Sequence, residues 1–128
     1  MQRKLLFIIA IGLVLAACGG SPTGSSGAGD PAKMVEKYLQ AKITNDEKGV
    51  RSMICAALEI DAQQEATTFL GTDGVELQTP ACAFNGTDKV TCTGKIVAKY
   101  GQEKNEFPLV SYKVVQEAGE WKYCGETN

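Results

Sequence analysis

The spacing of apolar residues changes at Gly74, and this change constrains the fold more than any other feature of the chain. Before Gly74 the apolar residues recur every three or four positions, as they do on one face of an α-helix. Asp30 and Pro31 are start signals for a first helix. Its apolar positions are Met34, Val35, Tyr38, Leu39 and Ile43.

Two further helices are expected before Gly74. Asn45 and Asp46 break the first pattern and cap the second helix, whose apolar stripe extends to Leu58. Its positions are Val50, Met53, Ile54, Ala57 and Leu58. Asp61 is expected to cap a short third helix that Gly71 ends, because glycine readily adopts the left-handed backbone found after helices.

After Gly74 apolar and polar residues alternate, as they do along β-strands that have one buried face. Four strands are expected, over residues 75–84, 89–100, 107–117 and 120–124, with turns at 85–88, 101–105 and 118–119. Pro80 cannot donate a backbone hydrogen bond, so the first strand is expected at a sheet edge or with a bulge. Helices followed by an antiparallel meander predict an α+β domain.

Four short segments carry a family resemblance. They are residues 34–39 (MVEKYL), 92–94 (CTG), 112–115 (YKVV) and 120–122 (EWK). They resemble small bacterial lipoproteins with a nuclear-transport-factor-2-like, or cystatin-like, domain, and the similarity covers most of residues 31–125. The resemblance implies N-terminal helices packed on a curved four-stranded antiparallel sheet that forms a cone. Many members of that lipoprotein group have no known function.

The first residues have the order of parts of a secretory signal peptide. Arg3 and Lys4 precede an unbroken apolar run over residues 5–15, and the small residues Ala16 and Ala17 follow it. A transmembrane helix needs about 20 apolar residues, which is more than this run supplies. We therefore expect residues 1–17 to be a cleaved signal peptide.

Cys18 follows these residues directly, and Leu15-Ala16-Ala17-Cys18 resembles the lipobox of bacterial lipoproteins. The resemblance implies that Cys18 carries a covalent lipid, that no other cofactor is needed, and that membrane lipid is a partner. Two or three acyl chains give stable anchoring, whereas one binds only marginally. The expected location is the extracytoplasmic side of the cell membrane or the outer membrane. Gly19, where an inner-membrane signal would have Asp, looks like the outer-membrane sorting pattern.

Residues 18–30 are rich in glycine and serine, so we expect a flexible linker between the anchor and an α+β domain at 31–128. Removing residues 1–17 removes two basic residues, which leaves 11 basic against 15 acidic residues and a net charge of −4. This charge argues against nucleic acid as a partner.

Four cysteines remain after the anchor: Cys55, Cys82, Cys92 and Cys124. An even number in an exported domain predicts two disulfides. No metal site is expected, because the chain has no histidine and no Cys-x-x-Cys pair. In a meander two strand spacings, about 9.5 Å, separate Cys92 from Cys124. This exceeds the roughly 7 Å limit for a disulfide, so we expect Cys82–Cys92 and Cys55–Cys124.

No catalytic residue is assigned from the sequence. Without histidine there is no Ser-His-Asp or Cys-His nucleophile, and phosphate loops and dinucleotide fingerprints are absent. Enzymes of the wider fold use an acid with tyrosine inside the cone, and Glu59 or Asp61 is expected near its rim. The candidate cavity-lining residues are Tyr38, Tyr100, Tyr112 and Tyr123. Tyrosines at such spacings more often pack in a core with the hydroxyl at its edge.

Two classes of function therefore stay open. The first is a non-catalytic binding or interaction module of the cell envelope, for an envelope protein or a small apolar ligand. The second is a small enzyme of the isomerase or dehydratase type that uses a cone-shaped cavity. A tyrosine-lined cavity with a buried carboxylate would favour the enzyme, and a filled cone with an exposed apolar patch would favour the module.

Overall fold

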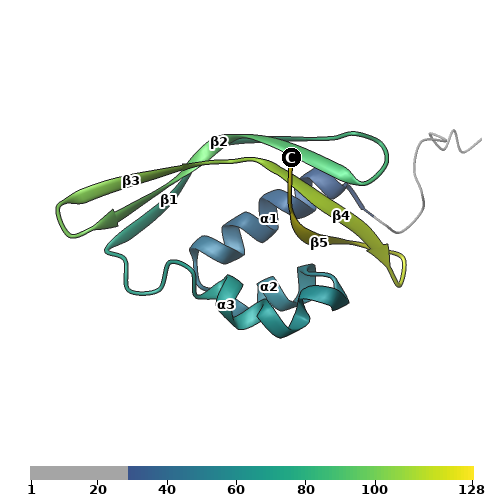
Figure 1. Ribbon diagram of the computed structural model, residues 1–128, viewed down its shortest axis with the longest axis horizontal. Coiled ribbons are helices and arrows are strands. Elements are labelled where there is room, and N and C mark those ends of the chain that lie inside the picture. The colour runs from purple at the N-terminus through teal and green to yellow at the C-terminus, as the bar shows by residue number, and fades with distance from the viewer. Residues whose placement is uncertain (1–28) are drawn as a thin grey trace, which may run out of the picture.

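Helices precede strands in the computed structural model, which describes residues 29–128 (Figure 1). The helices are α1 (Pro31–Ile43), α2 (Glu47–Met53), the 3-10 helix η1 (Ala56–Asp61) and α3 (Ala62–Ala66). Within this range the strands are β1 (Gly74–Phe84), β2 (Lys89–Tyr100), β3 (Glu103–Pro108), β4 (Ser111–Glu117) and β5 (Glu120–Thr127). The predicted α+β class is confirmed. The expected signal peptide, Cys18 and the linker up to residue 28 lie outside the described residues.

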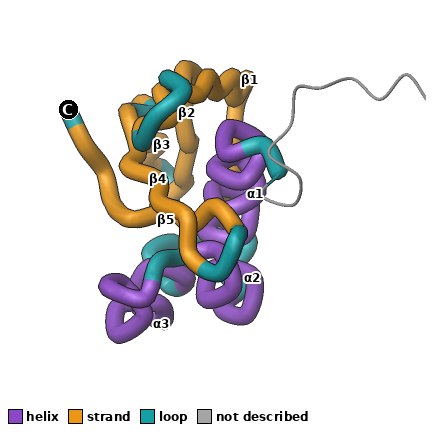
Figure 2. Tube along the Cα trace, turned by 90° about the vertical axis from the view of Figure 1, so that its right-hand side faces the viewer, coloured by secondary structure: helices purple, strands orange, loops and turns teal. Residues whose placement is uncertain are grey.

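Helix α1 begins where the sequence predicts. The Asp30 carboxylate accepts a hydrogen bond from the Ala32 amide at 2.9 Å, and Pro31 occupies the first turn, where a missing N–H costs nothing. The helix buries the predicted stripe, with Val35, Tyr38 and Leu39 almost fully enclosed. Figure 2 shows the strands curving around α1, which therefore lies on the concave side of the sheet.

The second helix ends at Met53, earlier than the predicted stripe to Leu58. The reason is pairing with the last strand. Ile54 forms a parallel bridge with Tyr123, and the Cys55 amide donates to the Tyr123 carbonyl oxygen at 2.8 Å. These contacts hold Ile54 and Cys55 in extended backbone, and the helical conformation returns at Ala56, the first residue of η1.

The prediction that the Asp61 side chain caps the third helix is wrong. Asp61 lies at the start of α3, but its side chain makes no capping hydrogen bond. The preceding η1 already places Asp61 in helical backbone, so its carboxylate is not positioned as an N-cap acceptor. The helix also ends earlier than predicted, at Ala66, and Gly71, with φ of +84°, is the last residue of the turn that follows it.

The prediction of four strands is wrong by one, because the expected third strand is two strands. Its first part, β3, pairs with the second half of β2, and its second part, β4, pairs with the first half of β2. Between these stretches β2 advances four residues, from Thr91 to Lys95, while the partner advances three. Gly94, with φ of +105°, lies in this bulge of β2. The turn expected at 101–105 is correspondingly shorter, since pairing begins at Glu103.

The sheet has the order β1-β2-β4-β5, with β3 beside β2, so β1 is an edge strand. The register of β1 on β2 shifts between Gln78 and Ala81, so the bulge predicted at Pro80 is confirmed. The alternation of apolar residues along β2 gives it one buried inner face, which consists of Val90, Cys92, Ile96 and Ala98. In Figure 1, α2 and α3 lie across α1 from β1 and β2. Among residues 29–128, no helix is long and apolar enough to cross a membrane.

Two disulfides fix the helical half and the first hairpin. Cys82 and Cys92 face each other across β1 and β2, with Cα atoms 4.1 Å apart. Cys55 and Cys124 join the segment after α2 to β5, with Cα atoms 5.3 Å apart. This is the pairing expected from strand order, since β4 separates β2 from β5.

Candidate functional site

A cavity of about 290 Å³ lies between the C-terminal half of α1 and the concave face of the sheet. The structure brings all four candidate tyrosines to its wall, from α1, β2, β4 and β5. The remaining wall is mostly apolar. Its other lining residues are Leu39, Lys42, Thr68, Phe69, Ile96, Phe107, Pro108, Leu109 and Glu126.

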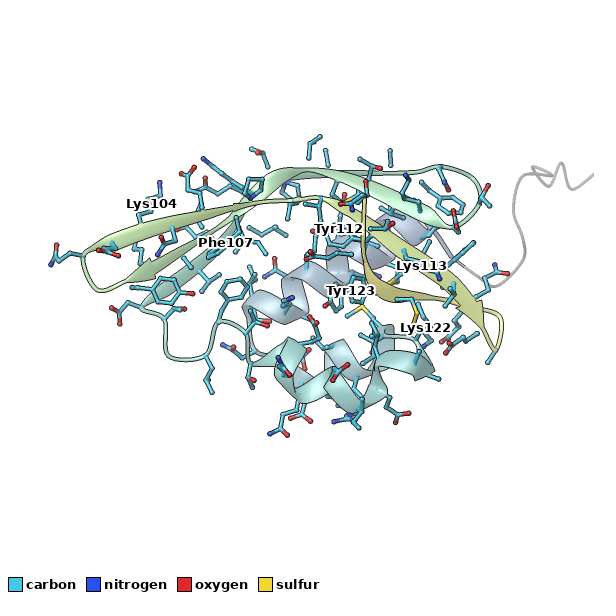
Figure 3. The ribbon with its side chains drawn as sticks, in the orientation of Figure 1. Lys104, Phe107, Tyr112, Lys113, Lys122 and Tyr123 are labelled. Carbon is cyan, nitrogen blue, oxygen red and sulfur yellow. A yellow bond between two sulfur atoms is a disulfide. The ribbon has the colours of Figure 1, made fainter. Side chains whose placement is uncertain are left out.

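The closed end of the cavity is formed by Tyr38, Tyr112 and Tyr123. Their exposed fractions are 0 %, 3 % and 3 %. The rings of Tyr38 and Tyr123 stack with centroids 3.9 Å apart, and those of Tyr112 and Tyr123 lie 5.9 Å apart. In Figure 3 the side chains of Tyr112 and Tyr123 lie between the last two strands and the helices. Helical spacing on α1 and inward alternation on β4 and β5 position these rings.

The mouth of the cavity is formed by Tyr100, Phe107 and Pro108, all on β2 and β3. Tyr100 and Phe107 are 44 % and 43 % exposed, so their rings are only half covered. Phe107 makes an edge contact with Phe69 at a centroid distance of 5.9 Å. The strand pair β2–β3 thereby reaches the segment after α3 across the opening.

A carboxylate that the sequence reasoning missed lies behind the closed end. The Tyr38 hydroxyl and the Lys42 ammonium both donate to Glu65 Oε2 at 2.7 Å. Burial opposes ionisation of Glu65, but these two hydrogen bonds outweigh it and hold the pKa of Glu65 below its ordinary value. Lys42 and Glu65 are 23 positions apart on different helices, so no local spacing signals the pair.

Burial also raises the pKa of each tyrosine at the closed end. For Tyr38 and Tyr123 the shift is large, and the neighbouring carboxylate of Glu65 adds to it. Burial raises the pKa of Tyr112 as well, and Glu126 contributes in the same direction. The three hydroxyl groups therefore stay protonated at neutral pH and can act as hydrogen-bond donors.

The carboxylates expected at the rim, Glu59 and Asp61, are not there. Both lie on η1, are exposed to solvent, and are absent from the cavity wall. Helix α2 ends early at the bridge between Ile54 and Tyr123, which changes the direction of the chain before η1. Glu126, on β5, is the carboxylate that lines the cavity.

No protein-family model matches this chain, and no curated protein matches its sequence. Among solved structures, the chain is similar to the crystal structure of an NTF2-like protein of unknown function in nutrient uptake from Rhodospirillum rubrum. The TM-score is 0.48 and the sequence identity 17 %, over 76 % of this chain and 95 % of that chain. The α+β architecture described above stands on this chain's own elements and sheet order.

Proposed function

We propose that this chain is a lipid-anchored, extracytoplasmic binding module that holds a small, largely apolar molecule in its tyrosine-lined cavity. The observation that carries the proposal is the cavity itself. Its volume of about 290 Å³ is close to the lower end of the range for ligand sites, about 300–1,000 Å³. Its wall is mostly aromatic and aliphatic, with few polar groups, which is the usual composition of a small-molecule site.

The anchor is supported by the sequence alone. The apolar run, the small residues and Cys18 stand in the order that lipidation requires, and Pro31 begins the folded part a short distance later. A Gly/Ser-rich linker of about this length reaches roughly 15–20 Å, which lets the cavity face the surrounding solution. Radiolabelled palmitate supplied to cells should label the chain, and Cys18→Ser should not be labelled. An unlabelled wild-type chain that is released into the medium would refute the anchor.

The binding proposal predicts that a larger side chain in the cavity wall lowers the amount of ligand bound. The full chain is placed in phosphatidylcholine nanodiscs and equilibrated with 2-ethylnaphthalene, and empty nanodiscs give the partition into lipid. Ile96→Phe adds volume to the cavity wall and should lower the specifically bound probe several-fold. Val97→Ile is the control, because its side chain projects from the opposite face of β2. Equal binding by the two variants, or none above empty nanodiscs, would refute the cavity as the site.

The alternative, an enzyme of the isomerase or dehydratase type, has one observation in its favour. Glu65 and Tyr38 bring a carboxylate and a phenol together beside the cavity. However, Glu65 does not line the cavity, and its lowered pKa makes it a weak base. Deuterium exchange at the methyl group of 2-acetylnaphthalene in D2O distinguishes the two functions. Exchange that the chain accelerates, and that Glu65→Gln abolishes, would replace the binding proposal with the enzyme.

A further inference from the structure

The three tyrosine hydroxyls at the closed end differ in whether their proton is already donated to an acceptor within the protein. The Tyr38 hydroxyl is engaged, because its proton goes to Glu65 Oε2. The Tyr112 hydroxyl accepts a long hydrogen bond of 3.5 Å from the Val110 amide and keeps its own proton. Among residues 29–128, no hydrogen bond of 3.5 Å or less runs from the hydroxyl of Tyr112 or Tyr123 to a protein acceptor, although the Tyr123 ring stacks on that of Tyr38 and brings the two hydroxyl groups near each other.

At least one of these donors opens into the cavity. The described part of the chain contains no enclosed side-chain oxygen or nitrogen without a hydrogen-bond partner, so the Tyr123 hydroxyl, for which no hydrogen bond is found, must reach accessible space. Tyr123 lines the cavity and is almost fully buried, so the space that its hydroxyl reaches is the cavity. Tyr112 lines the same cavity, and its ring lies 5.9 Å from that of Tyr123. A buried donor gains most from a ligand that accepts its hydrogen bond, because an unpaired buried donor is costly.

The charged groups of the wall disfavour a charged ligand. Lys42 is the cation of the wall, and its charge is matched by Glu65 at 2.7 Å. An anion would have to compete with Glu65 for Lys42 and would also meet Glu126. A cation would meet Lys42, while the attraction of Glu126 is weakened by water, since its side chain is exposed.

We propose that the cavity selects apolar molecules that carry one uncharged hydrogen-bond acceptor, such as a carbonyl oxygen, bound by the hydroxyl groups of Tyr112 and Tyr123. The inference rests on the proposed function, since it names the ligand class of the same cavity. The exposed rings of Tyr100 and Phe107 at the mouth then contact the apolar part of the ligand, and the acceptor points inward to the two donors.

Four probes with one naphthalene skeleton test the inference. They are 2-acetylnaphthalene, 2-ethylnaphthalene, 2-naphthoate and 2-naphthylmethylammonium, so only the polar group changes. Binding to the full chain in phosphatidylcholine nanodiscs is measured by equilibrium dialysis and corrected with empty nanodiscs. The ketone should bind tightest, by about 2- to 10-fold over the hydrocarbon for each hydroxyl engaged. Tighter binding of either charged probe would overturn the inference.

Tyr112→Phe and Tyr123→Phe remove only the donors and keep the rings. Each should lower the ratio of ketone to hydrocarbon affinity, and the double variant should bring that ratio close to one. Tyr100→Phe is the matched control at the mouth and should leave the ratio unchanged. Because both affinities come from the same preparation, partial unfolding of a variant cancels in the ratio. If the protein binds the hydrocarbon as tightly as the ketone, this inference alone is refuted. If it binds none of the four probes, the proposed function is refuted as well.

Discussion

The two ends of the cavity are built by different means. The closed end, formed by Tyr38, Tyr112 and Tyr123, draws on α1, β4 and β5, and both the Cys55–Cys124 disulfide and the bridge between Ile54 and Tyr123 tie β5 to the segment after α2. Its side chains are almost completely buried. The mouth, formed by Tyr100, Phe107 and Pro108, lies on the strand pair β2–β3, and every residue of β3 is exposed.

The difference separates two tasks in one cavity. Polar groups discriminate between ligands only if they are held in place and kept from water, and the closed end provides both conditions. The mouth supplies half-exposed aromatic surface, which attracts apolar molecules without fixing their orientation. We therefore expect changes at the closed end to affect stability and ligand selection, and changes at the mouth to affect ligand affinity but not the choice between ligands.

The largest effect is expected from removing the disulfide of the closed end. In the chain-entropy model the loop of 69 residues closed by Cys55–Cys124 contributes about 4 kcal/mol, whereas the loop of 10 residues closed by Cys82–Cys92 contributes about 3 kcal/mol. Cys55→Ala with Cys124→Ala should lower the free energy of unfolding more than Cys82→Ala with Cys92→Ala. Guanidinium unfolding followed by far-ultraviolet circular dichroism measures both.

A second readout connects this prediction to the cavity. Loss of Cys55–Cys124 frees β5 next to Tyr123, so the near-ultraviolet signal of the stacked tyrosines should weaken. The Cys82–Cys92 disulfide lies away from the stacked tyrosines, so its removal should leave their near-ultraviolet signal intact. An equal loss of the signal in both double variants would show that the closed end does not depend on its own disulfide.

Most of the fold could be predicted because it follows from local periodicity and from strand geometry. The stripe of α1, the inner face of β2 and the bulge at Pro80 each come from a repeat or from proline's missing N–H. The division of the third strand into β3 and β4 could not be predicted from the sequence. It is caused by the bulge in β2 at Gly94, and a bulge depends on how two strands pair. The early end of α2 also follows from distant pairing, here between Ile54 and Tyr123.

The candidate site was predictable in part for the same reason. The inward positions of Tyr38 and Tyr112 follow from the periodicity of their own elements, and the structure places them together with Tyr100 and Tyr123. The carboxylate was misplaced: Glu59 or Asp61 was expected at the rim, whereas tertiary packing brings Glu65 to Lys42.

A smaller effect is expected from Glu65→Gln, which keeps an acceptor for Tyr38 but removes the charge that pairs with Lys42. The cost should be about 1 kcal/mol at pH 7, below the roughly 1.5–3 kcal/mol of hydrogen bonds to charged groups, because the pair is partly exposed and the glutamine of the variant still accepts from Tyr38. The folded state lowers the pKa of Glu65 below its ordinary 4.5, so its stabilisation is present above that pH and is lost as pH falls through the folded pKa.

Denaturant unfolding at several pH values between 7 and 3 measures this difference. The gap between the wild-type chain and Glu65→Gln should be widest near neutrality and should close in acid. Glu106→Gln on β3 is the matched control, because Glu106 pairs with Lys95 at 2.8 Å but is exposed, and no measurable change is expected. A gap that widens as pH falls would contradict the assigned direction of the Glu65 pKa.

The smallest effect on stability is expected at Tyr100, at the mouth. Tyr100→Ser should change the free energy of unfolding by about 0.5 kcal/mol or less, as is usual for exposed positions. Phe107→Ser also loses the edge contact with Phe69, which contributes about 0.5–1.5 kcal/mol. In each variant, the affinities for 2-ethylnaphthalene and for 2-acetylnaphthalene should fall by the same factor. The ratio of the two affinities should stay at the wild-type value, because the donors at the closed end are untouched. A changed ratio would mean that the mouth also selects the polar group, and the separation of tasks between the two ends would be wrong.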